Sequence, residues 1–277
     1  MLNQKMIAFI GSGIMAEAMI KGLLRKGMVA PDNVVASGPR PERGQELFDR
    51  YAVRTTTDNV EAVNGAEIVV LSVKPQVLCP VLEELGGHVA SSALVLSIVA
   101  GAKTDTIQRM LEVPAVVRVM PNTPAQIGLG ISVWVATEAT SDAQRGQALA
   151  MLQALGEEVN VDDERYLDMA TALSGTGPAY VFLLMEAMVD AGVHLGFSRH
   201  VSERLVIETL RGSVEYARQS PRHLAALRNQ VTSPGGTSAE AIYHLEKGGL
   251  RTVLSRAIWA AYQRSRSLGS QAQADGQ

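Results

Sequence analysis

Residues 6–16 read Met-Ile-Ala-Phe-Ile-Gly-Ser-Gly-Ile-Met-Ala, an apolar run that stops at two glycines and continues into helix formers. This pattern predicts a buried strand that turns directly into a helix. Gly11 allows the tight turn, Gly13 allows backbone to approach a pyrophosphate, and Ala16 allows the helix to pack closely on the strand. The stretch has the GxGxxA form of a dinucleotide-binding turn. An ordinary tight turn is the alternative, but the position behind an N-terminal strand favours a dinucleotide.

The bulk composition is that of a globular protein, with 277 residues, 47% hydrophobic residues and a formal net charge of −3. This length predicts one or two domains, and the charge balance gives no reason to expect nucleic acid as a partner. The single cysteine, Cys79, can form no internal disulfide, which suits a reducing cytoplasm. The apolar segment 178–193 is short of a membrane span and contains Glu186 and Asp190. We therefore expect a cytoplasmic protein with no membrane partner and no bound metal.

Strand-like and helical segments alternate through the first part of the chain. This alternation predicts an α/β fold class, in which residues 1–162 form a Rossmann-type dinucleotide-binding domain with a parallel sheet and right-handed crossovers. Strands are expected near 6–10, 33–37, 53–55, 67–73, 94–98, 115–120, 131–136 and 158–161. Helices are expected over 14–27, 41–51, 58–64, 104–111 and 142–155. The helix 41–51 is expected to turn Arg43, Glu46 and Arg50 towards solvent.

Beyond about residue 163, long helical periodicity replaces the strands. We expect helices over 166–173, 177–195, 200–219, 221–229, 237–247 and 250–268. They would form an all-α domain over 163–269, followed by a disordered tail at 270–277. These helices carry more apolar surface than one small bundle can bury, namely on Leu183, Leu184, Met185, Met188, Val206, Ile207, Leu254, Ile258 and Trp259. Because such surface marks an interface, we predict a homodimer formed through this domain.

Small or polar residues follow five of the predicted strands, and ligands of open parallel sheets bind at these carboxyl ends. They are 11–15, Ser37 with Arg40, 72–75, 98–101 and 121–124. At the second strand end, an NAD enzyme usually has a carboxylate for the ribose. Ser37 and Arg40 stand there instead, and a hydroxyl and a guanidinium can both bind a 2′-phosphate. NADP is therefore favoured; the alternative is that Arg40 is a solvated charge and both cofactors are accepted.

Two further residues at the strand ends have open roles. Pro75 forces Lys74 into an extended conformation beside the cleft, where it could be a catalytic lysine, could position the cofactor or could simply cap the strand end. Asn122 lies in a proline-framed loop, where it could contact the nicotinamide amide or stabilise a turn.

Two glycine-rich polar stretches interrupt the helical part, at 173–180 (LSGTGPAY) and 232–238 (TSPGGTS). In the second, Gly235 and Gly236 free the backbone, and Thr237 and Ser238 open a helix. Several N–H donors and hydroxyls would then converge, which suits a carboxylate. A capping box with Glu240 is the alternative that needs no ligand.

Five motifs in this order together resemble the pyrroline-5-carboxylate reductase family: GSGIMA, SVKP, VRVMPNTP, LSGTGPAY and VTSPGGTS. The resemblance covers residues 6 to about 267, and the last two motifs are the most specific. It implies reduction of Δ1-pyrroline-5-carboxylate to L-proline with NAD(P)H, the last step of proline biosynthesis. It also implies a Rossmann domain followed by a helical domain that forms an interlocked dimer, often assembled further into a decamer.

The resemblance also implies site residues. With Arg40 and Asn122 added, the expected contacts of NADPH, or of NADH as the second candidate, are Ile10, Gly11, Ser12, Gly13, Ile14, Met15, Ser37, Asn59, Ser72, Val73, Lys74, Pro75, Ile98, Val99 and Ala100. The expected substrate contacts are Glu164, Ser233, Gly235, Gly236, Thr237 and Ser238. Thr237 and Ser238 are the catalytic candidates, and positioning is favoured over proton transfer because a neutral hydroxyl is a poor acid. Ser238 stands where many members have Thr, and Gln230 where some have Asn.

Two alternatives to this function stay open. One is a reductase of the same architecture that acts on another cyclic imine or on a β-hydroxyacid. A hydroxyacid enzyme would need a lysine in its first long inter-domain helix, and residues 166–195 contain none. The other is a catalytically inactive NADP-binding protein that senses nucleotide or acts as a scaffold.

Overall fold

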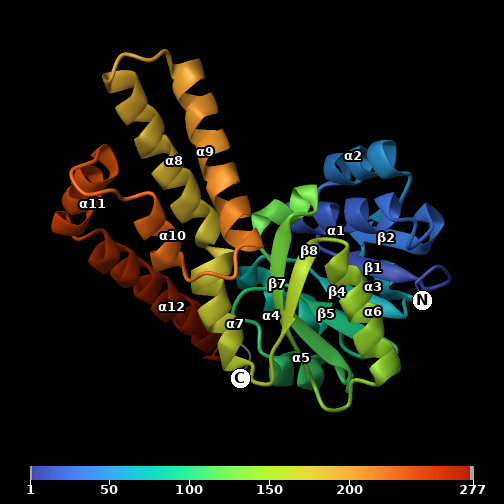
Figure 1. The fold of residues 1–277 in the computed structure, drawn as a ribbon. Helices are drawn as coiled ribbons and strands as arrows, with labels where there is room; N and C mark the ends of the chain where they lie inside the picture. Colours follow the sequence, from blue (N-terminus) through green and yellow to red (C-terminus); the bar gives the residue numbers. More distant parts are fainter. Residues whose placement is uncertain (1, 275–277) are drawn as a thin grey trace. The chain divides into compact units, whose positions relative to one another are not determined.

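The computed structural model describes residues 2–274, and side chains as far as residue 268 (Figure 1). Contacts divide the chain into two compact units. The first contains the residues up to Gly177 together with those from Ala260 onward, and the second is Pro178–Trp259. Each unit is described by itself below.

Eight strands of the first unit form one sheet in the order β3-β2-β1-β4-β5-β6-β7-β8. The strands are β1 (Ile7–Ile10), β2 (Val34–Ser37), β3 (Arg54–Thr56), β4 (Ile68–Leu71), β5 (Leu94–Ser97), β6 (Val116–Met120), β7 (Gly130–Ala136) and β8 (Gly156–Asn160). The predicted parallel pairing is confirmed from β3 through β6. It is wrong for β7, which is antiparallel to β6, with Val119 opposite Trp134. The link 121–129 is too short for a crossover helix, so the chain must turn back.

Helices cover both faces of the sheet and confirm the Rossmann-type α/β fold (Figure 1). One layer contains α1 (Ile14–Arg25), α2 (Pro41–Tyr51) and α6 (Asp142–Gln153); the other contains α3 (Asn59–Val63), α4 (Leu78–Leu85) and α5 (Thr104–Leu111). Neighbouring residues of β1 serve opposite cores, because strand side chains alternate between faces. Phe9 packs with Met19 in the first core, and Ile10 packs with Leu82 in the second.

Helix α4 is absent from the predicted elements. Its third residue is Pro80, a residue that disfavours a helix interior. A proline is tolerated in the first turn, because the N–H that it lacks would have no acceptor there.

The first unit continues past residue 162, where we expect the dinucleotide-binding domain to end. Helix α7 (Arg165–Ala170) contacts β6 and β7, and a π-helical turn follows at Thr171–Gly175. The remaining helices are α8 (Gly177–His194), α9 (Arg199–Gln219), α10 (Leu224–Gln230), α11 (Thr237–Lys247) and α12 (Leu250–Ala274). Helix α12 returns to the first unit at Ala260.

The end of α12 differs from the predicted disordered tail. The helix continues to Ala274, beyond residue 268, because the residues at 271–274 alternate Gln and Ala, which are good helix formers. The last three residues of the predicted tail, 275–277, lie outside the described part of the chain.

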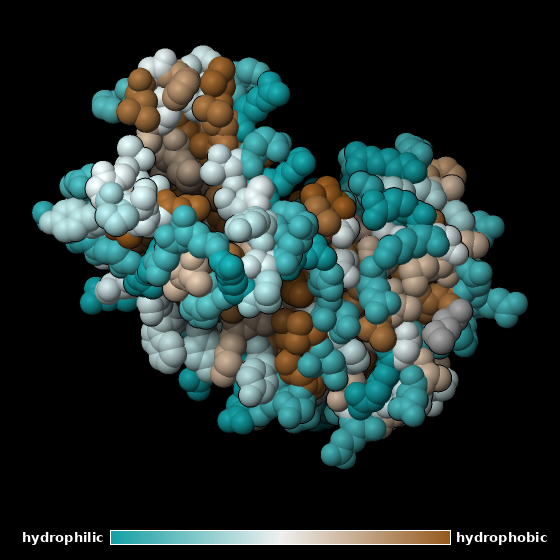
Figure 2. All heavy atoms as spheres, in the orientation of Figure 1, coloured by the Kyte–Doolittle hydropathy of each residue, from teal (hydrophilic) through white to brown (hydrophobic). Residues whose placement is uncertain are grey.

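The second unit exposes many apolar side chains. Of the nine residues expected at an interface, six are exposed: Leu183, Leu184, Met188, Ile207, Leu254 and Trp259. Val206 is buried within the chain, and Met185 and Ile258 are half-buried. Apolar groups show among hydrophilic ones over α8 and α9 (Figure 2). By length and composition alone, 165–194 is the one described helical stretch apolar enough to cross a membrane, a test that core helices of soluble proteins also pass.

Candidate functional site: strand ends and a glycine-opened helix

The turn after β1 needs glycine because the end of β4 lies against it. Gly11 has φ +99°, and its amide donates to the Ser37 carbonyl at 3.0 Å. A Cβ on Gly11 would lie 2.8 Å from the backbone C and O of Ser72. The Ser72 hydroxyl donates to the Gly11 carbonyl at 2.7 Å and to that of Ile10 at 3.1 Å. Gly11 and Ser72 therefore join two strand ends into one rigid edge.

Gly13 has no such internal reason to be glycine. It is the N-cap of α1, with φ −75° and ψ −176°, and a Cβ built on it would meet no described atom within 4 Å. No described side chain caps this helix. The space at the start of α1, with its free amides, fits the pyrophosphate of a dinucleotide.

The sequence predicts that Arg43 faces solvent, but in the structure Arg43 lies behind this turn. Its side chain is only 14% exposed. The Nε donates to the Ser12 carbonyl at 3.0 Å, Nη1 to Glu46 at 2.7 Å, and Nη2 to Glu17 of α1. The solvent-facing prediction holds for Glu46 and Arg50, which are 53% and 55% exposed. Arg43 thus connects α2 both to α1 and to the dinucleotide turn.

Glu17 accepts hydrogen bonds from three side chains of α2. It accepts hydrogen bonds from Arg50 at 2.9 Å and from the Tyr51 hydroxyl at 2.8 Å, in addition to Arg43. Burial opposes its charge, but the bonds from Arg43, Tyr51 and Arg50 outweigh it and lower the pKa of Glu17. The same contact raises the pKa of Arg43, and burial with the Glu17 bond raises that of Tyr51. Glu17 and Arg43 therefore stay ionised at neutral pH.

A pocket of about 360 Å³ opens beside the turn. Its lining is Gly13, Ile14, Glu17, Arg40, Glu42, Arg43 and Glu46. Arg40 is the exposed, extended N-cap of α2. Of the two residues expected to favour a 2′-phosphate, the structure brings Arg40 to this pocket. Ser37 is fully buried instead, and its hydroxyl donates to Asn59 Oδ1 at 2.6 Å.

The other predicted cofactor residues lie at the ends of β4 and β5. Lys74 is exposed and has the expected extended conformation, with φ −69° and ψ 146°, and Pro75 begins a short 3₁₀ turn. The Ile98 amide donates to the Leu71 carbonyl at 3.0 Å, which joins the ends of the two strands. Val99 is buried, whereas Val73, Pro75 and Ala100 are half-buried.

Asn122 supports the turn that follows β6. Its Nδ2 donates to the Ser174 carbonyl at 3.2 Å, and its Oδ1 accepts from the Ile131 amide at 3.0 Å. These contacts match the structural alternative for this residue, because both ends of the amide are bonded within the protein.

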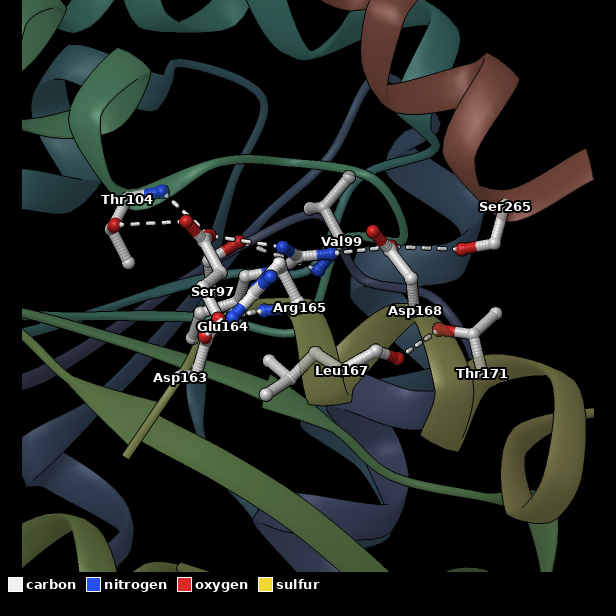
Figure 3. Close-up of polar contacts among 11 residues, drawn as sticks. Ser97, Val99, Thr104, Asp163, Glu164, Arg165, Leu167, Asp168, Thr171 and Ser265 are labelled. Carbon is white, nitrogen blue, oxygen red and sulfur yellow. Dashed lines mark hydrogen bonds and ion pairs between the residues drawn. The ribbon is translucent and has the colours of Figure 1, made fainter. Parts of the chain in front are cut away.

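Glu164 belongs to a partly buried network around Arg118 that the sequence patterns do not predict (Figure 3). Its Oε1 accepts from the Thr104 amide at 2.9 Å and from Arg118 Nη1 at 2.9 Å. Arg118 Nη2 also donates to Asp168 Oδ1 at 3.2 Å, and Ser265 donates to the same oxygen at 3.0 Å. Arg118 lies on β6 and is almost fully buried. A charged residue inside an apolar strand is the sequence feature that could have revealed this network, because buried charges need partners.

The loop 231–236 joins α10 to α11 in the second unit. Gly235 has φ +71°, and the Gly236 amide donates to the Ser233 carbonyl at 3.0 Å. Gly236 is the N-cap of α11, and no described side chain caps it, so the capping box with Glu240 does not form. Instead, Glu240 Oε1 lies 3.3 Å from His244 Nε2, one turn further along α11. The amides of Thr237 and Ser238 in the first turn have no acceptor within an α-helix.

The predicted substrate residues fall in both units. Glu164 is in the first unit, whereas Ser233, Gly235, Gly236, Thr237 and Ser238 gather at the start of α11 in the second. All the predicted cofactor residues are in the first unit.

Family models match both parts of the chain. The model for pyrroline-5-carboxylate reductase dimerisation matches residues 164–268. The model for NADP oxidoreductase, coenzyme F420-dependent, matches residues 6–101.

Similar proteins cover nearly the whole chain. The pyrroline-5-carboxylate reductase of Pseudomonas aeruginosa is 42% identical over 266 residues, which cover 96% of this chain and 97% of the relative. That of Synechocystis is 40% identical over 263 residues, which cover 95% and 98%. The solved structure of Plasmodium falciparum pyrroline carboxylate reductase with NADP bound has a TM-score of 0.89 at 30% identity, and covers 97% of this chain and 100% of that one. Such identity over nearly full lengths shows that the chain belongs to the pyrroline-5-carboxylate reductase family.

Proposed function

We propose that the chain reduces Δ1-pyrroline-5-carboxylate to L-proline with NAD(P)H, the last step of proline biosynthesis. The observation that carries this proposal is the 40–42% identity to reductases of that name over 95–96% of the chain. The geometry agrees, because a dinucleotide turn and an uncapped, glycine-opened helix are the two anion sites that the reaction needs.

The first unit would hold the cofactor, with NADPH preferred over NADH. Gly13 and the free amides of α1 suit the pyrophosphate, and Arg40 suits a 2′-phosphate. β2 ends at the buried Ser37 and not at a carboxylate, which removes the usual partner of an NAD ribose. The bound nicotinamide supplies the hydride for the imine carbon.

The start of α11 would hold the substrate. The amides of residues 235–238 suit its carboxylate, which orients the ring, and the Thr237 and Ser238 hydroxyls lie at the same helix start. Ser238, or a water that it holds, is our candidate for donating the proton to the imine nitrogen or for stabilising the iminium. The role of both hydroxyls is mainly positioning, because an unperturbed hydroxyl is a weak acid.

The helical part would form a homodimer, with a decamer as the larger assembly that the family resemblance implies. Six exposed apolar residues on α8, α9 and α12 and the match to the dimerisation model support this proposal. The same match, over 164–268, supports a functional domain boundary near residue 162. A cytoplasmic location without nucleic acid or membrane partners agrees with the net charge of −3.

Turnover of the purified protein tests the reaction. We expect oxidation of NADPH and formation of L-proline with pyrroline-5-carboxylate, and no turnover with piperideine carboxylates. Oxidation with the six-membered imines alone would favour the other cyclic-imine reductase, and no oxidation with either would favour an inactive NADP-binding protein.

The Ser238→Ala variant tests the substrate site. We expect a lower turnover number with an unchanged dissociation constant for NADPH. Ser213→Ala, an exposed serine on α9, is the control and should keep wild-type turnover. Wild-type turnover in Ser238→Ala would refute the role of this hydroxyl.

A further inference from the structure

We propose that Arg43 is a positioning residue for dinucleotide binding, which acts by fixing the peptide group between Ser12 and Gly13. The starting observation is that the Arg43 Nε donates to the Ser12 carbonyl at 3.0 Å from within α2. This bond reaches across 31 residues of sequence to the middle of the dinucleotide turn. The inference rests on the cofactor part of the proposed function and is independent of the substrate.

The hydrogen bond from Arg43 also fixes the N–H on the other side of the turn, because the Ser12–Gly13 peptide group is planar and trans. The chain has no cis peptide among its described residues, so the Ser12 carbonyl and the Gly13 N–H point in opposite directions. While Arg43 holds the carbonyl, the Gly13 amide points away from Arg43. It then adds to the free amides of the first turn of α1, which are the donors that a pyrophosphate requires.

Because the turn is rich in glycine, the orientation of the Ser12–Gly13 peptide has to be fixed by a residue outside the turn. Gly13 has open space where a Cβ would stand, so packing of its own side chain cannot fix its orientation. Gly11, on the other side of Ser12, is held by its hydrogen bonds with Ser37 and Ser72. These bonds do not reach the peptide group that follows Ser12. Without Arg43, rotation of the Ser12–Gly13 peptide would turn a carbonyl oxygen towards the phosphates.

The environment of Arg43 keeps its guanidinium in place. Nη2 pairs with Glu17 and Nη1 with Glu46 at 2.7 Å. With the bond from Nε to Ser12, all three nitrogens of the guanidinium are therefore bonded. A lysine has one ammonium group on a flexible stem and cannot hold these three partners in one geometry. We therefore expect the role to require arginine and not only a positive charge.

Arg50 offers a matched control on the same helix. It also pairs with Glu17, at 2.9 Å, but is 55% exposed and makes no hydrogen bond to the dinucleotide turn within the described part of the chain. Arg43→Met and Arg50→Met each remove one positive charge from α2 and one partner from Glu17. Only the first releases the Ser12 carbonyl.

Equilibrium binding to the full-length protein tests the inference, with dissociation constants measured for NADPH and for NADH by calorimetry. We expect Arg43→Met to weaken both cofactors about tenfold, by the same factor, because the pyrophosphate is common to both. Arg50→Met should stay within about twofold of wild type. In turnover, the KM for NADPH should rise in Arg43→Met while kcat at saturating cofactor stays unchanged.

Several results would overturn the positioning role of Arg43. A loss confined to NADPH would mean that Arg43 contacts the 2′-phosphate directly. An equal loss in Arg50→Met would mean that only charge matters. Arg43→Lys is the second variant in case Arg43→Met does not fold, and wild-type affinity in it would also contradict the inference. Failure of the wild type to reduce pyrroline-5-carboxylate would count against the proposed reaction alone, because the binding constants do not involve that substrate.

Discussion

Arg118 of β6 bonds Glu164 through Nη1 at 2.9 Å and Asp168 through Nη2 at 3.2 Å, so one buried guanidinium holds the N-cap carboxylate of α7 and a carboxylate within that helix. Its side chain is 4% exposed, whereas those of the two acids are 26% and 22% exposed. Glu164 in turn accepts from the Thr104 amide at the start of α5. The network therefore joins a sheet strand, the helix after β5 and the helix after β8.

Removal of Arg118 should destabilise the protein strongly. Arg118→Met leaves two partly buried carboxylates without their cation, and breaking a buried pair in this way costs about 3–5 kcal/mol. The free energy of unfolding in denaturant measures the loss. Arg165→Met is the matched control, because among the described residues that arginine forms its ion pair with its neighbour Asp163 and is 84% exposed; it should change stability little. Equal free energies of unfolding for the two variants would show that the network does not stabilise the protein.

The two glycines of the dinucleotide turn should respond differently to alanine. Gly11→Ala should cost about 1–3 kcal/mol from its backbone conformation, and more from contact with Ser72. Gly13→Ala should change stability by no more than about 0.5 kcal/mol, because no described atom lies within 4 Å of the new methyl. Its effect should appear as weaker NADPH binding. Denaturation and cofactor titration of both variants separate the two roles, and unaltered NADPH affinity in Gly13→Ala would contradict the assignment.

The charge at Arg40 should select between the cofactors. Arg40→Glu replaces an exposed guanidinium in the pocket with a carboxylate that repels a 2′-phosphate. We expect NADPH affinity to fall about tenfold to a hundredfold, with little change for NADH. Arg109→Glu, an exposed arginine on α5, carries the same charge change and should leave both affinities near wild type. Equal weakening of the two cofactors in Arg40→Glu would rule out selection by this residue.

Glu17 should contribute to acid sensitivity. Its pKa in the folded protein lies below the ordinary 4.5, because bonds from Arg43, Tyr51 and Arg50 outweigh burial. A group with a lowered folded-state pKa stabilises the protein above its unfolded pKa, and this contribution is lost as pH falls from 4.5 through the folded value. Glu17→Gln should therefore lose less stability than wild type over that interval. Thermal unfolding across this pH range checks it, and parallel curves would contradict the expectation.

Local patterns predicted most of the fold. The bounds of α2, α5 and α11 agree with the expected ranges, because Pro41, Thr104 and Thr237 begin clear amphipathic or polar-to-apolar segments. Strand direction was less accessible. Nothing in the apolar alternation of β7 differs from that of a parallel strand, so the short link from β6 is the sequence feature that could have predicted its antiparallel direction.

The site was predictable in its glycines and less so in its polar contacts. Gly11 and Gly235 have sequence patterns because their positive φ, and at Gly11 the close approach of Ser72, disfavour other residues. Gly13 belongs to the GxGxxA pattern, in which this glycine leaves space for a pyrophosphate. No pattern in a single chain identifies the partners of Arg43 in α1 and the turn, because Glu17 and Ser12 lie 26 and 31 residues away in sequence. Arg118 stands out only as a charge within an apolar strand, which does not identify its partners 46 and 50 residues away. Periodicity alone assigned Arg43 to the solvent side, since it cannot show that α1 and the turn approach α2.

The hydrogen bond from Ser265 to Asp168 has a consequence for how the protein is made. Ser265 lies on the last helix, and the part of that helix from Ala260 belongs with the dinucleotide-binding unit. During synthesis, residues up to Gly177 leave the ribosome well before this closing segment, with the whole of Pro178–Trp259 between them. The first unit therefore cannot complete its fold as an independent N-terminal body, and a chain truncated after Trp259 should emerge with the Asp168 end of its network open.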